Sequence, residues 1–198
     1  MKTLILSDYD IISEYIKDAL SELNVHTSDK FSWHTGKFYT KELLLVEEYN
    51  RKELPALLDL LLIDKPIKNI ISIGLGNSLG THLKEGDILI NDYPSGSCQE
   101  LVDRFLNDST DEFGERPLRI FVGNIFDDTQ EHEFTDDLAC RDFTNGELFS
   151  TLKAKGLSTL AIRIILGEQD QVSLDTETIN NVLPRLLLLL KQTVEQVS

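Results

Sequence analysis

Apolar and polar positions along this chain follow two periods, one typical of strands and the other of helices. Thr3–Leu6 is a short apolar run that predicts a buried strand. After Ser7 and Asp8, apolar residues recur from Ile11 to Leu23 at helical spacing, with charged residues between them. The chain therefore opens with a strand, a turn and a helix, as an α/β domain does.

Proline and glycine mark the ends of several later elements. Helices are expected over Pro55–Leu62, over Glu147–Ala154 with Gly156 as its C-terminal cap, and over about Asp175–Gln196. Apolar, β-branched runs predict the other strands, at Phe38–Val46, Asn69–Ile73, Asp87–Asn91, Leu118–Val122 and Thr159–Leu166.

Helices that alternate with strands predict an α/β three-layer sandwich with a central mixed sheet, as one domain over residues 1–198. A mixed sheet is expected because some neighbouring strands have connections too short for a helical crossover. The last helix contains Leu186–Leu190, which is apolar on more than one face and indicates either central core or a subunit contact. Two stretches fit no regular element: Gln99–Glu115, helical only in its first half, and Asp127–Asp142, an expected acidic loop.

Composition and charge narrow the range of partners. The chain has 198 residues, and 34 acidic against 19 basic residues give a net charge of −15, which opposes binding to nucleic acid or anionic membranes. No apolar run approaches the roughly 20 residues that span a bilayer, and the first one is too short for a signal peptide. Cys98 and Cys140 lack metal-type spacing, so we expect reduced thiols in a cytoplasmic protein. The acidic stretch around Glu131 matches no zinc or calcium spacing either.

Three glycines follow the strand at Asn69–Ile73, namely Gly74, Gly76 and Gly80. A dinucleotide-binding glycine loop must open a helix, but only Thr81–Gly86 separates these glycines from the next strand. Six residues are too few for a crossover helix, which excludes a nicotinamide site. The segment is expected to be a glycine-rich turn, either a plain one or one whose backbone approaches a ligand closely.

The segment Ile71–Ile90, which ends in Leu83–Ile90, resembles the central segment of the nucleoside phosphorylase superfamily, and within it the methylthioadenosine/S-adenosylhomocysteine nucleosidases. The first strand and helix, Arg119–Phe126 and Ala161–Ile165 follow in that family's order. The resemblance implies a phosphorylase/nucleosidase-like fold and a purine nucleoside or nucleobase as the ligand. It also implies a homodimer or larger homo-oligomer, and neither a metal ion nor a cofactor.

The same resemblance implies a degenerate catalytic site. Cleavage of a purine N-glycosidic bond needs an acid for the base, a carboxylate for the ribose hydroxyls and an activated water or phosphate. The family's positions for the acid, the ribose-binding glutamate, the water-activating glutamate and a small polar loop residue are occupied by Gly167, Thr144, Ile12 and Leu75. Two displaced carboxylates, Asp170 and Glu147, lie near the first two of these positions.

Two matched positions remain, Phe126 and Arg163, and together with the glycine segment they imply a ligand site made of Gly74, Leu75, Gly76, Asn124, Phe126 and Arg163. Phe126 either stacks on a purine or ends a buried strand, and Arg163 either meets the ligand or tethers a buried carboxylate. We therefore expect a nucleoside-binding protein whose cleavage activity is weak or lost. The alternatives are an active nucleosidase that uses Glu147 and Asp170, and an interaction scaffold that uses its acidic surface or Leu186–Leu190.

Overall fold

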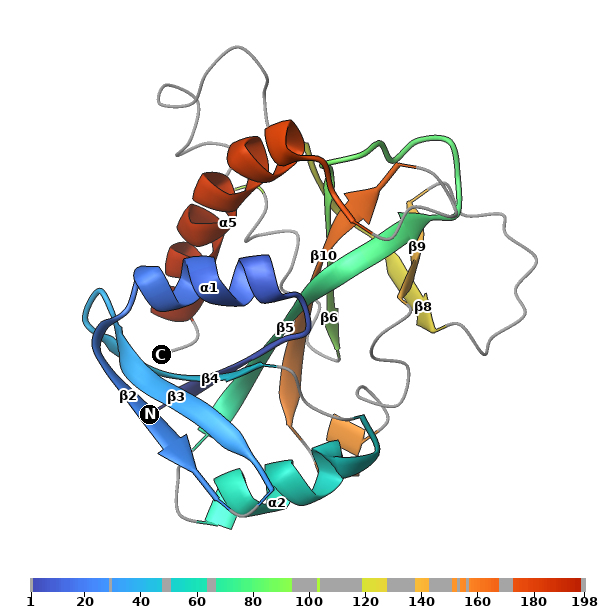
Figure 1. Ribbon diagram of the computed structural model, residues 1–198. Helices are drawn as coiled ribbons and strands as arrows, with labels where there is room; N and C mark the ends of the chain where they lie inside the picture. Colours follow the sequence, from blue (N-terminus) through green and yellow to red (C-terminus); the bar gives the residue numbers. More distant parts are fainter. Residues whose placement is uncertain are drawn as a thin grey trace.

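A mixed β-sheet forms the centre of the molecule in the computed structural model (Figure 1). The structure describes residues 2–28, 30–47, 51–63, 67–93, 103, 119–127, 138–142, 151–152, 154–155, 157–167 and 173–196. The main path of the sheet has the order β2-β3-β4-β1-β5-β10-β6-β7, and β9 joins β8 to β5. The strands are β1 (Lys2–Ser7), β2 (Ser21–Thr27), β3 (Ser32–Phe38), β4 (Lys41–Glu47), β5 (Ile67–Ser78), β6 (Ile88–Tyr93), β7 (Ile120–Val122), β8 (Asn124–Asp127), β9 (Ala139–Asp142) and β10 (Ser158–Leu166).

Helices cover both faces of this sheet. Helices α1 (Asp10–Asp18) and α5 (Thr176–Gln196) lie on one face, and α2 (Leu54–Ile63), preceded by the short 3-10 helix η1 (Arg51–Glu53), lies on the other (Figure 1). The α/β sandwich with a central mixed sheet, which the alternation of helices and strands predicts, is therefore confirmed. None of the described helices is both long enough and apolar enough to cross a membrane.

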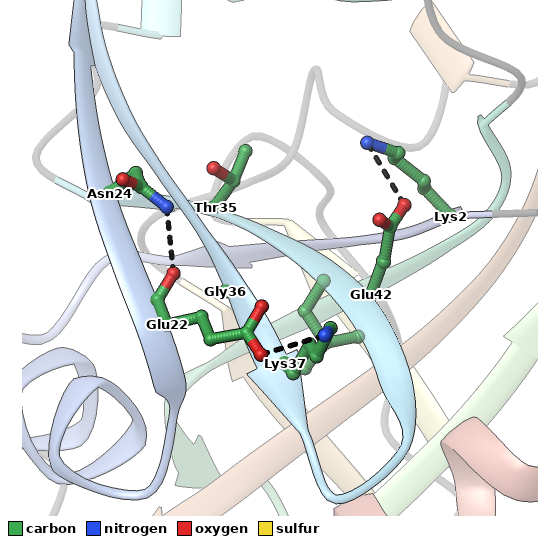
Figure 2. Close-up of a pocket in the computed structure, with 8 residues that line it drawn as sticks. Lys2, Glu22, Asn24, Thr35, Gly36, Lys37 and Glu42 are labelled. Carbon is green, nitrogen blue, oxygen red and sulfur yellow. Dashed lines mark hydrogen bonds and ion pairs between the residues drawn. The ribbon is translucent and has the colours of Figure 1, made fainter.

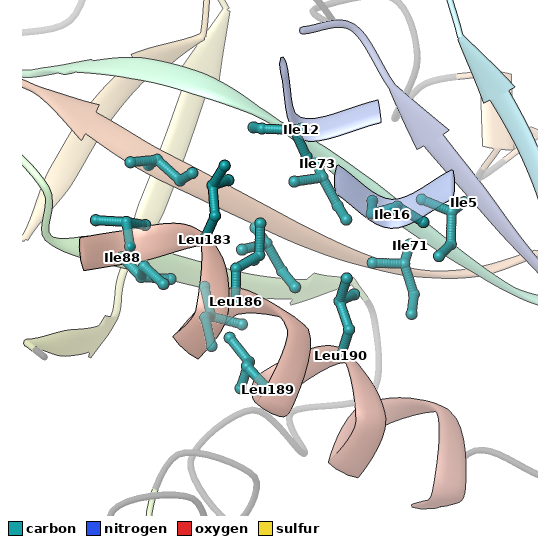
Figure 3. Close-up of a cluster of buried hydrophobic side chains, with 14 of the residues drawn as sticks. Ile5, Ile12, Ile16, Ile71, Ile73, Ile88, Leu183, Leu186, Leu189 and Leu190 are labelled. Carbon is teal, nitrogen blue, oxygen red and sulfur yellow. The ribbon is translucent and has the colours of Figure 1, made fainter. Parts of the chain in front are cut away.

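The larger hydrophobic core lies between the sheet and the helices α1 and α5 (Figure 3). Ile71 and Ile73 of β5 pack there with Ile12 of α1, and Leu186, Leu189 and Leu190 of α5 are at most 1% exposed. These three leucines of the run Leu186–Leu190 therefore belong to the central core, which is one of the two interpretations of that run.

The smaller core lies under α2 and uses the alternate positions of the same strands. Leu4 and Leu6 of β1 pack there with Leu57, Leu58 and Leu61 of α2. Because successive side chains of a strand point to opposite faces, one apolar run supplies both cores. This explains why the middle of β1 and of β4 is apolar without interruption.

The first helix is shorter than its pattern predicts. It ends at Asp18, and Leu23, expected on the helical stripe, lies in β2, the strand that pairs with β3. The expected strand Phe38–Val46 is present as β4 from Lys41 onward, and its first residues are the end of β3 and a turn at Tyr39, which has φ 53°. Pairing of β2 with the next strand, β3, overrides the local helical spacing here.

Two expected loops contain strands. Strand β5 continues to Ser78, so Gly74 and Gly76 lie within it and not in a turn, and β10 pairs with it as far as Asn77. Residues 79–87 then lead to β6 without forming a helix. A dinucleotide-binding loop would have to open a helix here, so its exclusion agrees with the structure. The acidic stretch Asp127–Asp142 contains the end of β8 and all of β9, and residues 128–137 lie outside the described part.

Other sequence-based expectations fall wholly or partly outside the described residues. They include the region Gln99–Glu115, of which only Asp103 is described, Cys98, and the cap at Gly156. Within the expected helix Glu147–Ala154, residues 151, 152 and 154 are described and helical.

We predict that Leu189→Ala lowers the free energy of unfolding by about 2–5 kcal/mol, because it leaves a cavity in the larger core. Leu60→Ala on α2 is the matched control, since Leu60 is 40% exposed and its loss leaves no enclosed cavity. Urea unfolding followed by circular dichroism measures both. Equal midpoints for the two variants would contradict this placement of α5.

Candidate functional site

The carboxyl ends of four neighbouring strands meet at one edge of the sheet. The strands β4, β1, β5 and β10 are parallel to one another. Ser7 pairs with Glu47 on one side and with Ile73 on the other, and Gly74 pairs with Arg163. Ligands of α/β proteins bind outside the carboxyl ends of parallel strands, so this edge is the candidate site.

Arg163 of β10 lies buried at this edge, with 0% exposure. Its Nε and Nη2 donate to Oδ2 of Asp142 at 2.9 and 2.6 Å. Nη2 also donates to the Ser72 hydroxyl at 3.0 Å, and Nη1 donates to the carbonyls of Ser72 and Ile162 at 3.0 and 2.9 Å. These five bonds equal the five N–H donors of a guanidinium, so Arg163 tethers a buried carboxylate.

Asp142, the partner of Arg163, ends β9 and is 1% exposed. Strand β9 pairs with β5 through only two residue pairs, Asn77 with Arg141 and Ser78 with Cys140. The ion pair of Asp142 with Arg163 therefore adds a strong connection from β9 to the main sheet. Strand β8 in turn pairs with β9, so this connection also fixes β8.

Charge balance keeps Arg163 ionised in spite of its burial. Burial alone would lower the pKa of Arg163, but the charges of Asp142 and Asp8 and the hydrogen bonds to Asp142 raise it above the ordinary value. Asp8 follows the last residue of β1 and is half-buried. Two carboxylates thus act on one guanidinium at this edge.

Two glycines of β5 let neighbouring side chains lie against its backbone. A Cβ at Gly74 would overlap with Oδ1 of Asp8, and one at Gly76 would come within 2.8 Å of the Cys140 sulfur. Gly74 therefore gives the Asp8 carboxylate room beside β5, and it does not lie in a turn. Burial raises the pKa of the Cys140 thiol to about 12, which leaves it protonated and unreactive at neutral pH.

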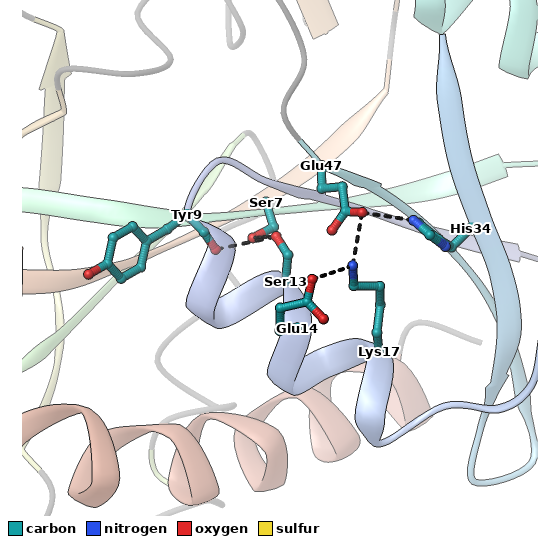
Figure 4. A network of polar contacts seen from close by, with 7 residues as sticks. All are labelled: Ser7, Tyr9, Ser13, Glu14, Lys17, His34 and Glu47. Atoms are coloured by element: carbon teal, nitrogen blue, oxygen red, sulfur yellow. Dashed lines mark hydrogen bonds and ion pairs between the residues drawn. The ribbon is translucent and has the colours of Figure 1, made fainter. Parts of the chain in front are cut away.

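On the other face of the same edge, a polar network attaches α1 to the strand ends (Figure 4). Oε1 of Glu47 accepts a hydrogen bond from His34 Nε2 at 2.8 Å and contacts Lys17 Nζ at 3.0 Å. The Ser13 hydroxyl donates to the Ser7 hydroxyl at 2.8 Å. Glu47, Lys17 and His34 are each less than one fifth exposed in their side chains, so the network is a fixed support.

The structure brings together only some of the residues proposed from the sequence. Gly74, Leu75 and Gly76 lie on β5 beside Arg163, and Leu75 packs against the larger core. Asn124 and Phe126 lie on β8, separated from β5 by β9, with Phe126 opposite Arg141 and Arg141 opposite Asn77. Glu147 and Asp170 lie outside the described residues.

Sequence reasoning missed Ser72, Asp142 and the role of Asp8. A signal for Ser72 was present, because Ser72, Gly74 and Gly76 alternate with the apolar residues of β5 on one face. Asp142 could not be found in this way, because it sits on a four-residue strand within an acidic stretch.

A small hollow at the opposite edge of the sheet carries no candidate function (Figure 2). It has a volume of about 100 Å³, well below the roughly 300 Å³ at which ligand pockets begin. Its charged side chains pair with one another, Lys37 with Glu22 at 2.7 Å and Lys2 with Glu42 at 3.0 Å.

The sequence matches no protein-family model and no curated protein sequence. Solved structures do resemble it along its whole length. The 5′-methylthioadenosine/S-adenosylhomocysteine nucleosidase of Neisseria meningitidis, in complex with methylthio-immucillin-A, has a TM-score of 0.75 at 11% identity and covers 98% of this chain and 99% of that chain.

Two further solved structures have a similar fold over nearly the whole chain. Futalosine hydrolase of Helicobacter pylori has a TM-score of 0.74 at 12% identity, over 99% of this chain and 98% of that chain. The 5′-methylthioadenosine/S-adenosylhomocysteine nucleosidase of Colwellia psychrerythraea, in complex with adenine, has a TM-score of 0.71 at 14% identity. The match covers 97% of this chain and 95% of that chain. The chain therefore has the nucleosidase fold that its sequence resembles.

We predict that Asp142→Asn lowers the free energy of unfolding by about 3–5 kcal/mol, because it leaves the Arg163 charge buried without its counter-ion. Asp59→Asn on α2 is the matched control. It removes an exposed ion pair with Lys155 and should have only a small effect. Urea unfolding at low salt compares them. The structural assignment fails if Asp142→Asn unfolds at the same urea concentration as the control.

We also predict that Cys140 resists thiol reagents in the folded protein at pH 8, since its pKa is about 12 and it is 0% exposed. Cys98→Ser leaves Cys140 as the single thiol. Labelling followed by mass spectrometry should give no adduct in the folded variant and one adduct per chain in urea. Rapid labelling of the folded variant would show that the β9 region is open.

Proposed function

We propose that this protein binds a purine nucleoside or a related metabolite at the carboxyl edge beside Gly74, and that N-glycosidic cleavage there is weak or lost. One observation supports the binding site most directly. The buried Arg163–Asp142 pair fixes β9 and β8 against the glycine-bearing strand, at the edge where this fold class binds ligands. A buried ion pair at that edge holds together strands that share few hydrogen bonds.

Three positions support weak or lost cleavage. Ile12, which occupies the family's place for a water-activating glutamate, is 0% exposed within the core. Leu75 packs against the same core, and Gly167, in the place of the acid, has no side chain that could donate a proton. The loss of one general acid or base typically costs about 10²–10⁴ in rate, so several losses leave little activity.

The ligand class is supported by the complexes of structurally similar proteins. The nucleosidases of Colwellia psychrerythraea and Neisseria meningitidis were solved with adenine and with methylthio-immucillin-A. Phe126 supplies an aromatic face on β8, on which a purine could stack. A homo-oligomer in the cytoplasm is part of the proposal, because the family resemblance implies the first and the reduced thiols fit the second.

We predict that the wild-type protein binds adenine or methylthioadenosine in calorimetric titrations, and that Phe126→Ala weakens this binding roughly 5- to 150-fold. The range follows from the about 1–3 kcal/mol that a stacked base contributes. Tyr39→Ala is the control, because Tyr39 lies in the β3–β4 turn at the opposite edge and is 57% exposed. No heat from adenine, methylthioadenosine or inosine would refute the proposal.

Base release from the same nucleosides tests the second part of the proposal. Weak or absent release is expected for the wild type. Rapid release that Glu147→Gln or Asp170→Asn abolishes would instead establish an active nucleosidase with displaced carboxylates.

A further inference from the structure

Asp8 is the one acidic residue near the start of α1 that is directed toward β5. It lies next to Gly74 because the preceding residue of β1, Ser7, pairs with Ile73. Its carboxylate contacts the Gly74 backbone so closely that no Cβ would fit between them. The other candidates lie elsewhere, since Asp10 is exposed and Glu14 pairs with Lys17 at 2.7 Å.

Asp8 belongs to the same charged group as Arg163 and Asp142. It interacts electrostatically with the Arg163 guanidinium, whose five N–H donors are used by Asp142, Ser72 and the Ile162 carbonyl. Asp142 is 1% exposed, whereas Asp8 is only half-buried. Of these two residues, Asp8 is the one with solvent-exposed surface, and its Oδ1 is enclosed against Gly74.

Asp8 and Phe126 lie at different ends of the candidate site. The hydrogen-bonded strand order from one to the other is β1, β5, β9 and β8. If the base of a nucleoside stacks on Phe126, the sugar is the part that extends across β9 and β5 toward β1. An ionised carboxylate accepts hydrogen bonds and donates none, so it suits the hydroxyl groups of a sugar.

We propose that Asp8 recognises the sugar of the ligand by accepting hydrogen bonds from its hydroxyl groups, which makes it a determinant of nucleoside over free base. This inference rests on the proposed nucleoside site and adds a residue to it. The family's position for a ribose-binding glutamate is Thr144 in this chain, and Asp8 supplies a carboxylate from the segment that follows β1. Asp8 thus acts in ligand selection, and no covalent step is assigned to it.

The test compares a ligand with a sugar and a ligand without one. Calorimetric titration of Asp8→Asn should give about 10- to 100-fold weaker binding of methylthioadenosine, the range for lost hydrogen bonds to a charged group. Binding of adenine, which has no sugar, should change less than threefold. Asp10→Asn is the matched control, because it removes an exposed carboxylate two residues away and should change neither affinity.

Each outcome decides one of the two proposals. Loss of methylthioadenosine affinity alone supports the role of Asp8, and restored affinity in Asp8→Glu would strengthen it. Equal weakening of both ligands, or no weakening, overturns the role of Asp8 and leaves the nucleoside site standing. Absence of binding in the wild type overturns the nucleoside site and, with it, the role of Asp8. Thermal melting of Asp8→Asn separates a folding defect from lost recognition, and a folding defect with normal methylthioadenosine affinity also overturns the role.

Discussion

The buried guanidinium of Arg163 imposes the strongest constraint on this structure. A charge that is fully enclosed costs several kcal/mol unless it is paired and its donors are satisfied. Asp142 of β9, Ser72 of β5 and the Ile162 carbonyl of β10 meet that requirement. The charge therefore ties β10, β5 and β9 together at the edge where the parallel strands end. The position of β8, and with it Phe126, follows from this arrangement.

The sequence predicts the central strands because each contains a mostly apolar run, whereas short or exposed strands such as β2 and β9 were missed. Strands such as Thr3–Leu6 and Thr159–Leu166 can be predicted from the local sequence alone, since both of their faces are buried. The last helix was also predictable, because its apolar stripe is long. The segment around Leu23 was misjudged, since its spacing suits a helix while β2 forms by pairing with residues of the next strand, β3. Local patterns do not contain that pairing.

The candidate site was less predictable, for a physical reason. Gly74, Arg163 and Phe126 could be identified from the family resemblance, but the contacts of Arg163 depend on Asp142, which is remote in sequence. The importance of Asp8 is likewise visible only in space, where its carboxylate lies against Gly74. In the sequence Asp8 is one of several acidic residues before a helix, and nothing local separates it from Asp10. A polar residue acquires its role from distant partners, whereas a buried apolar residue needs only its periodicity.

The contact between Asp8 and Gly74 also limits how this chain can vary over time. A larger residue at position 74 overlaps with the Asp8 carboxylate and displaces it from its place beside β5. The effect of a substitution at either position therefore depends on the residue at the other. A lineage in which the Asp8 carboxylate keeps this place is expected to keep glycine at position 74.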